Sequence, residues 1–339
     1  QHMETQATLK DRRPKFMFTT GAVTVPNYTR SKAGKKGEFH HKIGFLIVEN
    51  IPATDNTQDD EFVARHVTCK KDGSFMDVSL QVKGGEVSKV DGWSAFAFGD
   101  THLDKEDTEL LNEARRLIDE VGADKTIWHD LFDGYSIKHH DKNNYSKQVR
   151  NSIQGRDILQ KELDMNYAFI DEWLDTNMVI IPSNHNDWID RWVTTNEGYG
   201  DAKNAQLFNE LQAVTFRGES PKGLYAYLLD KRYGDKITTL GRDKSYLVEG
   251  IEVNNHGDLG ANGSRGTPNQ FHKLNVKILS GDKHNMYTYD LAYGLGVSGK
   301  LDHGYNRGMS SWGQGNGIIH RNGEYQHLMY FNGKFTNQI

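Results

Sequence analysis

The sequence contains little cysteine, little proline and no long apolar run. Its 339 residues include six prolines and a single cysteine, Cys69. One thiol excludes a disulfide framework and a zinc site built from cysteines. No segment reaches the roughly 18 consecutive apolar residues of a membrane-spanning helix, and the N-terminus has no apolar signal segment. We therefore expect a soluble, cytoplasmic protein.

The chain also lacks an excess of basic residues. Its 41 lysines and arginines face 46 aspartates and glutamates, which gives a net charge of −5 with neutral histidine. This balance excludes a uniformly basic protein that coats nucleic acid. It leaves room for an enzyme that acts on nucleic acid, because metal ions at a carboxylate-rich site restore positive charge there. Hydrophobic residues make up 36% of the chain, enough for a folded core, and 34 glycines and 15 histidines stand out.

Strand-like and helix-like patterns divide the chain into three regions. Residues 1–12 are interpreted as a tag remnant and flexible lead, residues 13–92 as a β-rich region, and residues 93–339 as the main domain. In the main domain, strand-like segments alternate with amphipathic helical stretches before a strand-rich end, which favours an α/β fold. The predicted helical stretches are residues 105–121, 145–175, 201–216 and 224–232, and residues 29–37 are predicted to be a basic loop.

Asp, His or Asn side chains follow five predicted strands at the point where each strand ends. A single residue of this kind is more often a helix cap than a ligand. Ligand sites in open α/β sheets, however, lie outside the carboxyl ends of the strands, so five such ends can converge on one crevice. These side chains are Asp100 and His102, Asp130, Asn184 and His185, His256, and Asp282 and His284.

The chemistry of this set predicts a metal centre. Carboxylate, imidazole and amide groups without thiolates suit Mn²⁺, Fe²⁺, Zn²⁺ or Mg²⁺. Two ions about 3.5–4 Å apart need a bridging carboxylate and further ligands on each side. The set is large enough to supply both, so we expect a dinuclear site.

The order of these motifs resembles the calcineurin-like metallophosphoesterases, the superfamily that includes the Mre11/SbcD-type nucleases. The resemblance covers about residues 93–339 and implies a four-layer α/β/β/α sandwich. It implies that Asp130 bridges two metals and that His185 contacts the scissile phosphate and assists the leaving group. It also implies the remaining ligands: Asp100, His102 and His284 for the first metal, and Asn184 and His256 for the second.

Three positions depart from the family pattern. His129 and Ser183 stand where the family usually has glycine, and Asp282 stands where it has a histidine ligand of the second metal. As an oxygen ligand, Asp282 would make the second site harder and favour Mn²⁺, with Mg²⁺, Fe²⁺ and Zn²⁺ as alternatives. If Asp282 points away instead, the second site is weak.

Four further segments look like a phage subset of the superfamily, the pre-early nucleases with which T5-like phages degrade host DNA. The subset extends the resemblance into the β-rich region and implies a location in the host cytoplasm. The segments are residues 19–24, 33–41, 256–266 and 305–312.

We therefore predict a two-metal phosphodiesterase, a DNase that uses a metal-activated water as nucleophile. Lys35 and Lys36 in the basic loop and Arg265 in a glycine-rich loop are candidate phosphate contacts, although a solvated turn is the alternative for the lysines. DNA is the expected partner, no membrane partner is expected, and a homo-oligomer stays open. The alternative functions are a phosphomonoesterase or small-nucleotide phosphodiesterase, and a non-catalytic binding module with a degenerate metal site.

Overall fold

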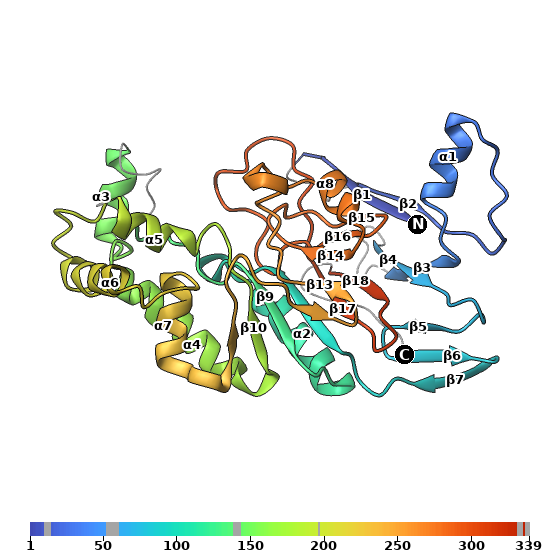
Figure 1. The fold of residues 1–339 in the computed structure, drawn as a ribbon, viewed down its shortest axis with the longest axis horizontal. Helices are drawn as coiled ribbons and strands as arrows, with labels where there is room; N and C mark the ends of the chain where they lie inside the picture. Colours follow the sequence, from blue (N-terminus) through green and yellow to red (C-terminus); the bar gives the residue numbers. More distant parts are fainter. Residues whose placement is uncertain (10–14, 52–60, 138–143, 196, 331–334, 336–339) are drawn as a thin grey trace, which may run out of the picture.

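The chain has a mixed α/β fold in which strands and helices form several sheets and layers (Figure 1). The α/β class predicted from the sequence is confirmed. A computed structural model describes residues 1–9, 15–51, 61–137, 144–195, 197–330 and 335.

A six-stranded sheet lies at the centre of the main domain. Its strands run in the order β11-β10-β9-β8-β17-β18, and β8 to β11 are parallel to one another while β17 and β18 are antiparallel. The four parallel strands therefore have their carboxyl ends at one edge of the sheet. The strands are β8 (Ala95–Asp100), β9 (Thr126–His129), β10 (Met178–Ile180), β11 (Thr238–Thr239), β17 (Gly315–Ile319) and β18 (Tyr325–Met329).

A seven-stranded sheet joins the two ends of the chain. Its order is β12-β13-β14-β16-β15-β1-β2, with β13, β14 and β16 parallel and the other neighbours antiparallel. The strands are β1 (His2–Gln6), β2 (Lys15–Thr19), β12 (Leu247–Val248), β13 (Ile251–Glu252), β14 (Lys277–Ser280), β15 (Tyr287–Tyr289) and β16 (Ala292–Gly294).

The two sheets pack face to face through a shared apolar core. Ala97 and Ile127 of the six-stranded sheet meet Ile251 and Leu279 of the seven-stranded sheet in one buried cluster. Such strands are covered on both faces, which explains their continuous apolar runs. Complete burial of one such aliphatic side chain stabilises the fold by about 2 kcal/mol.

Helices cover the outer faces of the two sheets. Phe98 and Trp128 stack at 3.6 Å between ring centroids and pack with helices α2, α4 and α7. On the far side, Phe271 of α8 packs against Ile278 and Tyr287 of the seven-stranded sheet. The layers are therefore helix, sheet, sheet and short helix. The helices are α1 (Lys32–Phe39), α2 (Thr108–Val121), α3 (Tyr145–Ile153), α4 (Leu159–Trp173), α5 (Asp187–Thr194), α6 (Ala205–Arg217), α7 (Leu224–Tyr233) and α8 (Pro268–Phe271).

Helix α2 shows how the sequence forms one of these elements. Asp107 caps its N-terminus by accepting a hydrogen bond from the backbone N–H of Leu110 at 3.2 Å. Its apolar residues recur at helical spacing and face the core, as the sequence predicts. The buried residues are Leu110, Leu111, Ala114, Leu117 and Ile118.

The predicted basic loop at residues 29–37 is wrong, because most of this segment belongs to helix α1. Two glycines disfavour a helix in the sequence. Here they allow close packing instead: a Cβ at Gly34 would lie 2.0 Å from the carbonyl oxygen of Thr29, and one at Gly37 would lie 2.8 Å from the ring of Tyr28. Ser31 caps the helix by accepting from the Gly34 N–H at 3.1 Å.

Residues 1–6 also differ from the predicted flexible lead. Strand β1 lies between β15 and β2, and Met3 is buried in a core cluster with Val63 and Met329. Strands β1 and β2 therefore make the region before residue 93 part of a sheet of the main domain. Two smaller sheets complete this region: β3 (Gly44–Ile51) with β4 (Glu61–Thr68), and β5 (Phe75–Asp77) with β6 (Leu80–Lys83) and β7 (Glu86–Lys89).

Two further differences concern the helical part. The long stretch predicted at residues 145–175 is two helices, α3 and α4, separated where Gly155 adopts a φ of 65°. Helix α5 was not predicted, although it begins directly after the third strand end. None of the helices in the described part of the chain is long and apolar enough to cross a membrane.

Candidate metal centre

The predicted strand ends lie together in space. Because β8, β9 and β10 are parallel neighbours, the residues that follow them meet at one edge of the six-stranded sheet. His256 and His284 follow β13 and β14, which are parallel neighbours in the facing sheet. The carboxyl ends of these strands therefore meet where the sequence predicts the site.

Asp130 lies at the middle of this cluster. Its Oδ2 atom is 3.6 Å from Nε2 of His102 and 3.6 Å from Nε2 of His256. The same oxygen is 3.2 Å from Nδ1 of His185. One carboxylate therefore contacts an imidazole from each of the two predicted ligand sets, which is the geometry a bridging ligand needs.

Asp100 is the second buried carboxylate of the cluster. It is fully buried, with Oδ2 2.9 Å from Nε2 of His284 and Oδ1 3.9 Å from Nδ1 of His256. Gly281 allows this approach, since a Cβ there would lie 2.3 Å from Asp100 Oδ1. Asp100 thus links the strand ends of the two sheets.

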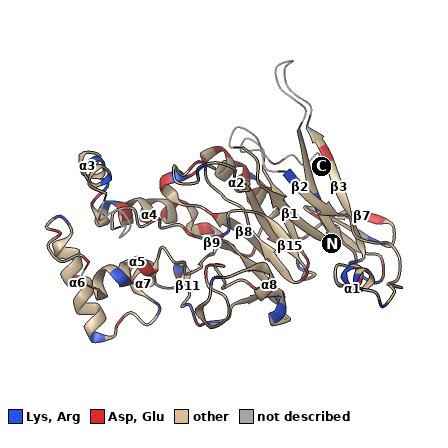
Figure 2. Cartoon of the chain, turned by 90° about the horizontal axis from the view of Figure 1, so that it is seen from above, with Lys and Arg blue, Asp and Glu red and all other residues tan. Residues whose placement is uncertain are grey.

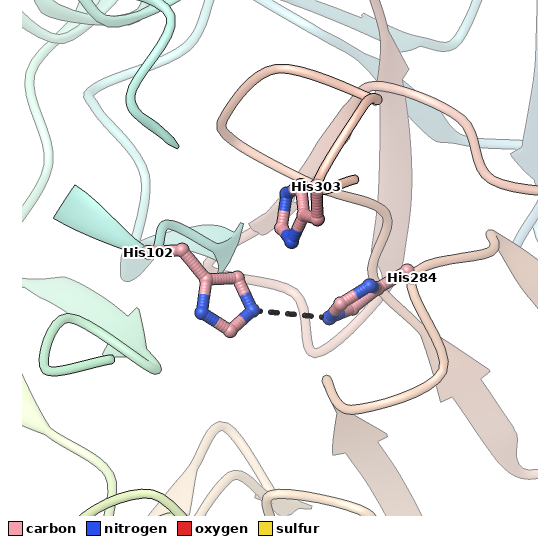
Figure 3. Close-up of side chains that lie close together, drawn as sticks. All are labelled: His102, His284 and His303. Carbon is pink, nitrogen blue, oxygen red and sulfur yellow. Dashed lines mark hydrogen bonds between the residues drawn. The ribbon is translucent and has the colours of Figure 1, made fainter. Parts of the chain in front are cut away.

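Three imidazoles meet beside Asp100, and one of them was missed in the sequence (Figure 3). His102 Nε2 and His284 Nε2 are 3.2 Å apart, and His303 joins them with a ligand atom within 4.8 Å of both. His303 lies in the loop between β16 and β17, with no predicted strand in front of it. Trp312 packs on His284 at 4.1 Å and on His303 at 5.0 Å between ring centroids, and so holds both rings in place.

His129 is a second member that the sequence did not identify as a ligand. The motif comparison marked it only as a departure from glycine. In the structure His129, Asp100 and His256 form a group whose ligand atoms lie within 4.8 Å of one another. His129 Nδ1 is 3.4 Å from His256 Nδ1, and the two rings stack at 5.7 Å.

Several site residues adopt the left-handed backbone region that non-glycine residues rarely occupy. The φ angles are 46° at His102, 51° at Asp130, 61° at Asp282 and 57° at His284. Each such residue costs on the order of 1–3 kcal/mol, and such costs concentrate at functional sites. Their clustering here is independent support for a functional site.

Burial and mutual contacts shift the pKa values of the acidic members. Burial raises the pKa of Asp130 well above its usual value. Burial acts in the same direction on Asp100, but the hydrogen bond from His284 and the charges of neighbouring histidines outweigh it and lower the pKa of that carboxyl. Burial alone would lower the pKa of His102, whereas Asp130 and Asp133 raise it to about 9.

Three other imidazoles of the cluster have lowered pKa values, which favours their neutral form at neutral pH. Burial lowers the pKa of His129 to about 4, lowers that of His303 to about 4, and lowers that of His256 well below its usual value. A neutral imidazole offers the lone pair that a metal needs. These rings therefore match the donor requirement of a divalent ion.

Unpaired buried atoms provide a direct test of fit to a metal. Asp130 Oδ1, Asn184 Oδ1, His256 Nε2 and His303 Nε2 are buried and, within the described residues, have no hydrogen-bond partner. Such atoms are costly unless something binds them. The buried His and Asp groups of this cluster could therefore hold metal ions.

Comparison with known proteins finds a phage relative. The chain is similar to Protein A1 of Escherichia phage T5, with 31% identity over 350 residues that cover 98% of this chain. The chain spans 62% of the length of that relative. No family model matches the chain, and no solved structure matches it.

Asp282 is the predicted ligand that the structure does not bring into the cluster. Its Oδ2 atom accepts a hydrogen bond from Lys283 Nζ at 2.6 Å. Within the described residues, the three potential metal groups do not include it. Position 282 carries a carboxylate and not an imidazole. His129, which lies beside His256, brings an imidazole to the same part of the cluster.

His185 and Asn184 lie where β10 leads into α5. His185 is 13% exposed, more than the rings of His102 and His256, and packs on Trp188 at 4.4 Å. It is thus the imidazole of the Asp130 group that an incoming molecule can reach.

The predicted phosphate contacts lie elsewhere. Arg265 is exposed and lines a cavity of about 350 Å³ together with Lys283 and residues of β1. Lys35 and Lys36 are exposed on α1, whose Phe39 packs on Tyr289 of the seven-stranded sheet. Among the described residues, no ion pair or hydrogen bond joins these three cations to the metal cluster.

Proposed function

We propose that the chain is a two-metal-dependent phosphodiesterase that hydrolyses DNA and belongs to the calcineurin-like metallophosphoesterases. The observation that carries the proposal is the position of Asp130 Oδ2 between His102 and His256. The helix, sheet, sheet, helix order of layers agrees with the sandwich of that superfamily. Similarity to a phage protein supports a phage origin. Degradation of host DNA in the host cytoplasm is part of the proposal.

The ligands would be Asp100, His102, Asp130 and His284 on one side, and Asp130, Asn184 and His256 on the other. Two divalent ions, with Mn²⁺ preferred, would neutralise charge on the phosphate and activate the attacking water.

The chain's own residues orient these donors. Asp133 Oδ1 accepts a hydrogen bond from His102 Nδ1 at 2.9 Å, which would direct the Nε2 lone pair at the cluster once a metal ion displaces the proton from Nε2. His129 Nδ1 lies at 3.4 Å from His256 Nδ1 and can orient that ring in the same way. Both contacts fix an imidazole before substrate arrives.

His185 has the position of a proton donor. Its ring is partly exposed, and its Nδ1 atom lies 3.2 Å from Asp130 Oδ2. A protonated His185 would donate to the leaving oxygen, or stabilise the charge that develops on it.

A non-catalytic binding module is the second candidate. The pairing of Asp282 with Lys283 favours it, since this pairing leaves the second side one ligand short of the family pattern. A phosphomonoesterase or small-nucleotide phosphodiesterase is the alternative within enzymes.

One assay separates these functions. The protein is stripped with EDTA, reloaded with Mn²⁺, Mg²⁺ or Zn²⁺, and tested on plasmid, linear duplex and single-stranded DNA beside p-nitrophenyl phosphate and bis-p-nitrophenyl phosphate. We expect hydrolysis of DNA and of the diester, restored best by Mn²⁺. Preference for the monoester would favour a phosphomonoesterase, and metal binding without turnover would favour the binding module. Full activity in excess EDTA would contradict a metal mechanism.

A further inference from the structure

A cationic cavity lies against the metal cluster. It has a volume of about 340 Å³. Five basic side chains line it, against the two carboxylates Asp104 and Asp133. The basic residues are Lys105, Lys147, Arg150, Arg156 and Arg307. In a chain of net charge −5, this is a local concentration of positive charge.

The cavity shares two residues with the metal centre. Asp133 lines it and accepts from His102 Nδ1 at 2.9 Å. His303 lines it and belongs to the group formed with His102 and His284. A molecule bound at the metal centre can therefore extend directly into this cavity.

Two of the five cations are held by neighbours and form its wall. Arg156 and Lys105 both pair with Asp104, at 2.6 Å and 2.9 Å. The guanidinium of Arg156 also lies 3.9 Å from the centre of the Tyr135 ring. These contacts fix the wall without neutralising the rest of the cavity.

Arg150 and Arg307 face the cavity without such neighbours. Both are exposed, and among the described residues neither has an ion pair. Arg150 belongs to α3, which lies at the opposite end of the molecule from α1 (Figure 1). Figure 2 shows basic residues in blue on α3. Arginine forms bidentate contacts with phosphate, so these two are suited to a phosphate backbone.

Tyr305 adds an aromatic surface to the same cavity. It is 57% exposed, and its ring packs edge-on against His303 at 5.8 Å. An exposed ring of this kind can stack with a base of any sequence. A positively charged groove with an aromatic platform is the arrangement that binds single-stranded nucleic acid.

We propose that this cavity binds one strand of the DNA substrate next to the cleaved phosphate, with Arg150 and Arg307 on neighbouring phosphates and Tyr305 against a base. The position of the cleaved phosphate rests on the proposed function. The three cations outside the Asp104 pairs exceed what a single phosphate needs, and a cavity of this volume admits a flexible strand more readily than a rigid duplex.

The test measures binding without catalysis. Fluorescence anisotropy of a labelled 12-nucleotide oligothymidylate is recorded in EDTA over a range of salt concentrations. For the double variant Arg150→Gln/Arg307→Gln we expect the dissociation constant to rise about tenfold at low salt. The slope of log K against log salt should fall by about 1.4, since each lost phosphate contact on a single strand contributes about 0.7.

Two further variants keep the result interpretable. Tyr305→Ala should weaken binding while the salt slope stays unchanged, because stacking releases no counterions. Lys89→Gln, which changes an exposed cation on β7, should leave both quantities unchanged. An unchanged salt slope in the arginine double variant would overturn the proposal. So would competition by ATP or tripolyphosphate as strong as that by the oligonucleotide.

This inference and the proposed function can fail separately. Binding that depends on the two arginines, in a protein that hydrolyses no diester with any metal, would leave the strand site standing and refute the enzyme. Diester hydrolysis with unaltered oligonucleotide binding in the double variant would support the enzyme and refute the strand site.

Discussion

The two sides of Asp130 differ in their donors. On one side His102, His284 and His303 bring three imidazoles within 4.8 Å of one another, next to Asp100. On the other side, the potential metal group found among the described residues joins His256 to one further imidazole, His129, and to the shared Asp100, while Asp282 is paired with Lys283. The donor-rich side should hold its ion tightly, and the donor-poor side should exchange its ion more easily.

The difference shows that a donor can reach the cluster from a position that the motif does not mark. Asp282 has an oxygen donor, but its carboxylate is paired with Lys283. His129, one residue before Asp130, brings its imidazole to His256 from another strand. The comparison between the two sides predicts five results.

The largest effect is expected for Asp130→Asn. Both sides depend on this carboxylate, and the amide loses the charge that offsets two cations. We expect loss of both ions and of activity, measured by inductively coupled plasma mass spectrometry beside turnover. Asp119→Asn, an exposed pair partner of Arg115 on α2, is the control and should behave as wild type. Two bound ions and full turnover in Asp130→Asn would show that Asp130 bridges nothing.

His185→Ala should separate chemistry from metal binding. Loss of a proton donor typically costs about 10²–10⁴ in rate, and we expect a defect of this size on DNA. The defect should be smaller on bis-p-nitrophenyl phosphate, because its leaving group needs no proton. Metal content should stay unchanged. Loss of one ion would instead show that His185 is a ligand, as its 3.2 Å approach to Asp130 allows.

Glu162→Gln tests a buried carboxyl that holds the loop following Asp133, next to the donor-rich side. Glu162 of α4 is buried and accepts hydrogen bonds from the Tyr135 and Ser136 N–H groups, in the loop that follows Asp133. Burial raises its pKa from 4.5 to about 7, so the folded chain keeps a proton that the unfolded chain loses. The contribution of Glu162 to the free energy of unfolding therefore falls by about 3 kcal/mol as the pH rises from 4.5 to 7.

The amide in Glu162→Gln cannot titrate, so this decline should be absent from the variant. Urea unfolding in EDTA between pH 4.5 and 8 gives the difference between the two proteins at each pH. The slope of that difference is the readout, because the amide also loses an acceptor at every pH. Parallel curves for the two proteins would contradict the shift.

The strand ends of the site could be predicted because the signal is local. An apolar run followed directly by Asp, Asn or His marks the end of a buried strand, and the parallel order of β8, β9 and β10 then brings such ends together. The predicted residues Asp100, His102, Asp130, His185, His256 and His284 accordingly lie in one cluster. Their individual roles remain predictions.

The missed residues lack that local signal. His303 stands in an irregular loop, where Trp312 packs on both His303 and His284. His129 looked like an altered motif position because its partner, His256, is 127 residues away. Strand β1 was missed for a similar reason, since it pairs with β15 and its Met3 packs with Val63 and Met329. Helix α1 was missed because its glycines, which disfavour a helix, pack on the nearby Thr29 and Tyr28.

His303→Ala and His129→Ala compare the two sides directly. Each substitution should lower the affinity for a different ion by about 10- to 100-fold, which is the usual cost of removing a residue that supports a metal ligand. Isothermal titration with Mn²⁺ should show two steps in the wild type. His303→Ala should lower the affinity of the tighter step, and His129→Ala that of the weaker step. Loss of the same step in both variants would refute the division into two sides.

Asp282→Asn should have the smallest effect. Its carboxylate is engaged by Lys283, and within the described residues it joins no potential metal group, so both titration steps should stay within about twofold of wild type. Lys283→Gln provides the complement, because it frees the carboxylate while leaving it in place. If the weaker step tightens in Lys283→Gln, the lysine is what keeps Asp282 from binding metal. If the weaker step disappears in Asp282→Asn, then Asp282 is the oxygen ligand that the sequence predicts, and the donor-poor side is completed by it and not by His129.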